Sequence, residues 1–180
     1  MGRSLLIAAG SPQDQARAAT APHAQPPSFV IKAVPTSTPP PIDGSVSSSL
    51  WQGAAKVDLA WDFTYLRPAT ETTTVYLLYD RKFLYVAFVA SQTQQIIATQ
   101  HTDDVGFGSD DRVSIFLWPS GVNGFTYWFG SNPIGTHYES SSENANFEPE
   151  WRSVGKTNRQ GYVVTMRIPL EVVRGAGNGQ

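Results

Sequence analysis

Short apolar runs separated by turn residues dominate the chain and pair naturally into hairpins. Three pairs stand out, at residues 72–80 with 82–90, 112–118 with 125–129, and 151–157 with 161–169. The runs are rich in β-branched and aromatic residues, and the connections contain Gly, Pro, Asn or Asp. Helical patterns are short and occur only around 48–55 and 170–173. We therefore predict an all-β fold, an antiparallel β-sandwich with immunoglobulin- or jelly-roll-like layers.

The second hairpin carries the pattern that bears on function. Because side chains alternate between the faces of a strand, two trios are predicted to face the core: Val113, Ile115, Leu117 and Phe125, Tyr127, Phe129. If Trp118 pairs with Thr126, Phe116 lies opposite Trp128. Phe116, Trp118 and Trp128 then form one aromatic patch on the other face. Burial is the alternative for the two tryptophans, because large aromatic side chains are mostly buried.

The first 40 residues differ in composition from the rest of the chain. They are rich in Ala, Pro, Ser and Thr, and only residues 29–34 have a strand pattern. We predict a disordered leader over 1–40, a sandwich over 41–173 and a tail over 174–180. Arg3, the apolar run 5–9 and the Ala-x-Ala at 16–18 read as a truncated export signal, with a plain disordered leader as the alternative.

Composition limits the classes of partner. The 180 residues are one domain's length, and 41% of them are apolar, enough for a sizeable core. Lys and Arg number 13 against 15 Asp and Glu, without a basic run, so nucleic acid is not expected as a partner. No apolar stretch approaches the roughly 20 residues of a membrane-spanning helix. The absence of cysteine excludes disulfides, thiolate metal sites and cysteine nucleophiles.

Acidic residues offer two further kinds of site. Asp103, Asp104, Asp110 and Asp111 flank a Gly-containing loop, and Asp110 and Asp111 are the predicted calcium ligands. Their spacing fits no EF-hand loop, so a solvated loop or a local hydrogen bond is the alternative. A glycosidase would need two carboxylates about 5–10 Å apart across a cleft. Glu143, Glu148 and Glu150 lie in a polar loop where solvated charge is the usual explanation, and no catalytic residue is assigned.

Five segments carry a resemblance to a known family. They are Ile42-Asp43-Gly44 followed by Trp51 and Ala54-Ala55, then ETTTVYLLYDRKFLYVAFVAS, DDRVSIFLW, FGSNPIGT and GYVVTMRIPLEVV. In this order the chain resembles the family 9 carbohydrate-binding module, in particular the related domain at the front of large bacterial secreted or outer-membrane proteins. The resemblance spans about Pro41 to Val173.

The resemblance implies a sandwich that binds an oligo- or polysaccharide without catalysis, often with structural calcium. It also implies an extracytoplasmic bacterial protein, in which the remainder of a larger chain carries an O-glycosyl hydrolase or an outer-membrane domain. Sugars suit an aromatic patch because their apolar C–H faces stack on rings. A structural or interaction domain that has lost sugar binding is the alternative, and haem binding through Met166 and His137 is another.

The chain departs from the family at the sugar-contacting positions. Family members that bind a sugar end use two facing tryptophans, and only Phe107, displaced by one place, can substitute for the first. The second lies beyond the last matched strand, so we expect closing strands to be missing and supplied by a longer protein. Three other ligand positions correspond to Ser91, Ser114 and Gly130. The predicted carbohydrate-binding residues are therefore Trp128, Trp118, Phe116 and Phe107.

Overall fold

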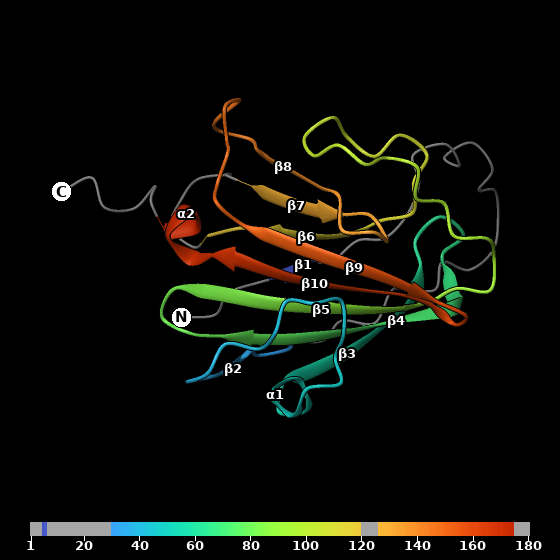
Figure 1. Ribbon diagram of the computed structural model, residues 1–180, viewed down its shortest axis with the longest axis horizontal. Coiled ribbons are helices and arrows are strands. Elements are labelled where there is room, and N and C mark those ends of the chain that lie inside the picture. Colours follow the sequence, from blue (N-terminus) through green and yellow to red (C-terminus); the bar gives the residue numbers. More distant parts are fainter. Residues whose placement is uncertain (1–4, 7–29, 120–125, 175–180) are drawn as a thin grey trace.

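Two β-sheets packed on a common core make up the molecule, as the computed structural model of residues 5–6, 30–119 and 126–174 shows (Figure 1). The smaller sheet has the order β1-β6-β7-β8, with β1 at Leu5–Leu6, β6 at Val113–Leu117, β7 at Tyr127–Ser131 and β8 at His137–Ser141. The larger sheet has the order β2-β4-β5-β10-β9, and β3 also pairs with β4. Its strands are β2 (Val34–Pro35), β3 (Ala55–Asp62), β4 (Arg67–Tyr79), β5 (Phe83–Ser91), β9 (Arg152–Asn158) and β10 (Gly161–Pro169).

The three predicted hairpins are confirmed as β4–β5, β6–β7 and β9–β10. Turn chemistry explains the first: Asp80 Oδ1 accepts hydrogen bonds from the backbone N–H groups of Lys82 and Phe83, both at 2.7 Å. The predicted short helices are also present, as α1 (Ser49–Gln52) and α2 (Leu170–Arg174). No helix in the described part of the chain is long and apolar enough to cross a membrane.

Some elements differ from the sequence prediction. β3 and β8 were not predicted, and the strand expected at 29–34 is reduced to Val34–Pro35. This short β2 pairs in parallel with β4, and Thr36 N donates to Tyr79 O at 2.8 Å. Backbone pairing to an available strand therefore orders part of the segment assigned to a disordered leader. Most of the predicted leader and tail, at residues 1–4, 7–29 and 175–180, lies outside the described residues, as do residues 120–125.

The main core lies between the two sheets. Val75, Leu77, Val86 and Phe88 face it from the larger sheet, and Val113, Ile115 and Phe129 face it from the smaller one. The core prediction is confirmed for Val113, Ile115, Leu117, Tyr127 and Phe129, while Phe125 lies outside the described residues. Met166 is fully buried in this core, where it serves packing. The β-sandwich prediction is confirmed.

A second apolar cluster covers the outer face of the larger sheet. Trp51 of α1 is fully buried against Leu78, Tyr85 and Ala87. Gly44 N donates to Thr165 Oγ1 of β10 at 2.9 Å, and Trp51 Nε1 donates to Pro41 O at 3.2 Å. The Ile-Asp-Gly and tryptophan elements of the sequence are therefore structural, because they attach the segment before β3 to this sheet.

Candidate functional site

An aromatic platform, defined as Trp118, Phe116 and Trp128, lies on the outer face of the smaller sheet. Phe116 pairs with Trp128 across β6 and β7, which confirms the predicted register. The Phe116 and Trp128 rings are nearly parallel, with centroids 6.0 Å apart and an interplanar angle of 8°. Phe116 and Trp118 have centroids 5.9 Å apart at 24°. The three rings thus form one continuous row.

Exposure varies along the aromatic platform. Trp118 is 36% exposed and so is not a core residue, whereas Phe116 and Trp128 are half-buried. Tyr138 of β8 meets the Trp128 ring edge-on, with centroids 5.2 Å apart. The indole N–H of Trp128 is buried and has no hydrogen-bond partner among the described residues. Trp118 is therefore the ring most open to a ligand, and Trp128 anchors the row to the sheet.

Phe107 does not lie on the surface of the platform, although it was predicted as a ligand contact. Its side chain is only 5% exposed and meets Trp128 edge-on, with centroids 6.2 Å apart. A Cβ atom at Gly130 would lie 2.8 Å from Phe107 Cε2, so only glycine leaves room for the ring. Because Ser114 and Gly130 are small neighbours on adjacent strands, they leave a recess that Phe107 fills.

Asp110 and Asp111 hold their own loop rather than an open cation site. The buried Asp110 carboxylate accepts four hydrogen bonds, from Thr99 N, Thr99 Oγ1, Gln100 N and Asn132 Nδ2. Burial would raise the pKa of Asp110, but these bonds outweigh it and lower the pKa to about 2. Asp111 Oδ2 accepts from Gln92 Nε2 and Ile97 N, both at 2.8 Å. The geometry supports the local hydrogen-bond alternative over calcium binding.

Asn132 connects this loop to the turn between β7 and β8. Besides its bond to Asp110, Asn132 Nδ2 donates to Gln100 O at 2.9 Å. Its Oδ1 accepts from the backbone N–H groups of Ile134 and Thr136. Asp110 N also donates to Phe107 O at 3.0 Å. The buried amide therefore fixes the loop that holds Phe107 over the sheet.

A different acidic cluster could hold a cation. Carboxylate oxygens of Asp104, Glu139 and Glu148 lie within 4.8 Å of one another. Glu139 is only 7% exposed and accepts a hydrogen bond from Trp151 Nε1 at 2.7 Å. Burial is the main cause that raises the pKa of Glu139 to about 7, and the neighbouring carboxylates raise it further against the effect of Trp151. Oxygen donors suit calcium, although three residues supply only part of its usual six to eight ligands.

Sequence reasoning missed Glu139 because β8 was not predicted. In β8, Glu139 pairs with Phe129, so alternation would have placed a carboxylate on the core side. The buried position of Glu139 also gives a substrate no access, so this cluster is not the open cleft a glycosidase needs. Glu143 and Glu150 are exposed, in agreement with solvated charge. His137 Nδ1 lies 3.3 Å from Asp103 Oδ1 and its ring packs on Trp151.

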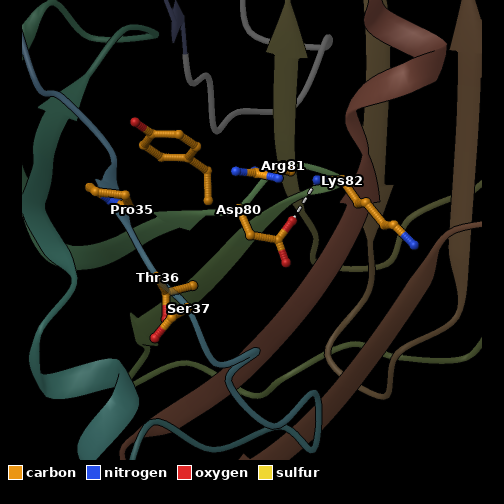
Figure 2. Close-up of a pocket in the computed structure, with 7 residues that line it drawn as sticks. Pro35, Thr36, Ser37, Asp80, Arg81 and Lys82 are labelled. Atoms are coloured by element: carbon orange, nitrogen blue, oxygen red, sulfur yellow. Dashed lines mark hydrogen bonds between the residues drawn. The ribbon is translucent and has the colours of Figure 1, made fainter.

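An open pocket of about 560 Å³ lies at the β4–β5 turn, on the larger sheet (Figure 2). Its lining comprises Pro35, Thr36, Ser37, Tyr79, Asp80, Arg81 and Lys82, and none of the platform residues. Figure 2 shows the Asp80 carboxylate bonded to the backbone of Lys82, whose side chain extends away from the other labelled residues. Tyr85 Oη also donates a hydrogen bond to Asp80 Oδ2 at 2.7 Å, so the Asp80 carboxylate stabilises the β4–β5 turn.

Comparisons with known proteins agree with this architecture. The family described as carbohydrate family 9 binding domain-like matches residues 42–180. The fold is similar to that of a carbohydrate binding module family 9 from Caldicellulosiruptor kristjanssonii in complex with cellotriose, with 17% identity and a TM-score of 0.52. The similarity covers 76% of this chain and 65% of that one, so the chain spans less than two thirds of its length. No curated protein matches the chain.

The structural likeness, at 17% identity, supports the fold alone, and the family match carries the classification. The matched residues include β3 to β10 and the covering segment with Trp51. The family is one of binding domains, which confirms the prediction that the domain is not by itself an enzyme. The chain belongs to the carbohydrate family 9 binding domain-like family.

Proposed function

We propose that this domain is a non-catalytic carbohydrate-binding module whose ligand stacks on the aromatic platform. The observation that carries the proposal is the row of three nearly parallel rings, with Trp118 exposed at its end. Apolar C–H groups of a sugar pack favourably against the exposed parts of such rings. The relative of similar fold was solved with cellotriose, which makes β-linked glucans the first ligands to test.

The ligand class that fits is an oligo- or polysaccharide, bound by a bacterial extracytoplasmic protein. The family resemblance supports a role in carbohydrate catabolism, with this domain beside a glycoside hydrolase or an outer-membrane domain of a larger protein. In that setting the domain keeps its parent protein close to the polysaccharide.

Substitution at Trp118 tests the proposal. We expect Trp118→Ala to weaken glycan binding by about tenfold or more, while the melting temperature changes by about 2 °C or less because Trp118 is partly solvated. Binding is measured by tryptophan fluorescence with cello-, xylo-, manno- and chito-oligosaccharides and by pull-down on insoluble polysaccharides. Tyr65→Ala is the matched control, since it removes a ring that is 60% exposed at the β3–β4 turn. Its binding should equal that of the wild type.

The alternative is a structural or interaction domain, favoured by the buried part of the aromatic cluster around Phe107. It predicts that the wild type binds none of these glycans and that Trp118→Ala lowers the melting temperature. That pair of results would remove the carbohydrate-binding proposal.

A further inference from the structure

The outer face of the smaller sheet has a recess that is already filled by the protein. Ser114 is 5% exposed and Gly130 is buried, and both lie beneath Phe107. A site for the end of a sugar chain encloses the terminal ring and satisfies its extra hydroxyl groups with fixed polar partners. Because Phe107 fills the recess above Ser114 and Gly130, this part of the sheet has no enclosed space for a terminal ring.

The polar groups near the recess are also committed to the protein. The Asp110 carboxylate accepts four hydrogen bonds, and Asn132 uses both ends of its amide within the loops. Phe107 O accepts from Asp110 N, so the backbone beside the ring is held as well. Moving Phe107 aside would therefore disturb a buried network, which argues against the recess opening for a terminal sugar.

What remains for a ligand is the row of platform rings. Successive centroids are 5.9 and 6.0 Å apart, and the interplanar angles are 24° and 8°. A polysaccharide repeats the same apolar surface along its length, so neighbouring sugars can contact neighbouring rings wherever the chain ends. Resting on the proposed function, we propose that the platform binds internal stretches of a polysaccharide chain and not its ends.

Oligosaccharides with intact and chemically reduced ends test this inference. Titration uses cellohexaose and xylo-, manno- and chitohexaose, each before and after borohydride reduction, which opens the reducing-end ring. For the sugar that binds, we expect dissociation constants to agree within about twofold, because the two internal segments are identical. Affinity should rise from the trisaccharide to the hexasaccharide, and the disaccharide in excess should displace the hexasaccharide poorly, since it offers ends but little length.

Two further outcomes would overturn the inference while leaving the proposed function intact. The first is loss of binding when the reducing-end ring has been opened by borohydride. The second is a disaccharide that binds as tightly as the hexasaccharide. Trp118→Ala provides the internal check, because it should weaken binding of the intact and reduced hexasaccharides by the same factor. Absence of binding by every intact and reduced sugar would instead overturn the proposed function, and this inference with it.

Discussion

At the residue scale, Asp110 shows how a surface-like sequence motif becomes a buried structural centre. Its four hydrogen bonds come from two loops that are distant in sequence, through Thr99, Gln100 and Asn132. Only an ionised carboxylate accepts all of these bonds, which is why the pKa falls to about 2 despite burial. Asp110 therefore contributes stability that depends on pH.

Removing this carboxylate should be costly. We expect Asp110→Ala to lower the free energy of unfolding by about 3 kcal/mol at pH 7, because several buried donors lose their acceptor. The folded-state pKa lies below the unfolded value of 3.8, so the contribution is complete above about pH 4 and is lost as pH falls towards 2. The wild type should lose about 2 kcal/mol of this contribution over that window, and the variant should not.

Urea denaturation at pH 7, 4 and 2.5 measures the effect. Glu150→Gln is the control, since Glu150 is exposed, and it should follow the wild type. If the free energy of unfolding of Asp110→Ala falls as much as that of the wild type between pH 4 and 2.5, this loss of stability does not come from Asp110.

Glu139 should have the opposite pH dependence. Its pKa is raised, mainly by burial, to about 7, so the folded state keeps a proton that the unfolded state has lost above its ordinary pKa of 4.5. Stability should therefore fall as pH rises from about 4.5 to about 7. Glu139→Gln keeps an acceptor for Trp151 Nε1 and removes the ionisation. We expect the variant to match the wild type near pH 4.5 and to be more stable at pH 8.

Thermal unfolding in EDTA at several pH values tests this expectation without bound cations. Glu143→Gln is the control, since Glu143 is an exposed carboxylate, and it should leave the dependence of stability on pH unchanged. If Glu139→Gln is no more stable than the wild type at pH 8, Glu139 is not destabilising when ionised.

At the scale of elements, turn chemistry and alternation made the hairpins predictable. Asp80 and the Asn158-Arg159-Gln160 connection mark turns by residue type, and the strands beside them have continuous apolar runs. β3 was missed because polar Lys56 and Asp58 interrupt its apolar residues, and because its first residue, Ala55, was assigned to the predicted short helix. β8 was missed because its sequence, HYESS, is polar, and it is a strand through its pairing with β7.

The contact between Phe107 and β7 can be tested by a double-mutant cycle. Gly130→Ala places a Cβ atom 2.8 Å from Phe107 Cε2, so we expect a loss of about 1–3 kcal/mol in stability from overpacking. Phe107→Ala removes the obstructing ring, and Gly130→Ala should then cost much less. Gly53→Ala is the control, because its added Cβ would meet no atom closer than 3.9 Å. Additive effects in urea denaturation would show that the two positions are not coupled.

At the scale of the whole molecule, the two outer faces of the sandwich differ in what they carry. The larger sheet is covered by the segment that contains the fully buried Trp51. The smaller sheet carries the aromatic platform, where Trp118 remains 36% exposed. Two tryptophans that each follow a leucine in the sequence therefore have different roles, one in stability and one available for recognition.

This difference gives a prediction for Trp51. We expect Trp51→Ala to lower the free energy of unfolding by about 3–5 kcal/mol, because it leaves a cavity beneath the covering segment. Trp118→Ala should cost less than about 1 kcal/mol, since it leaves no enclosed cavity. Chemical denaturation of both variants measures the contrast, and equal losses would show that Trp118 is as structural as Trp51.

The sequence by itself determined the strands of the three hairpins and which of their residues share a face. Alternation with period two depends only on local backbone geometry, so one register placed Phe116, Trp118 and Trp128 together. Only the tertiary structure decided the surroundings of that row. Phe107 fills the recess over Gly130, and the Asp110 carboxylate accepts hydrogen bonds from the loops around it. Glu139 lies beside Asp104 and Glu148. Each of these contacts joins segments that approach one another only when the loops pack on the sheets.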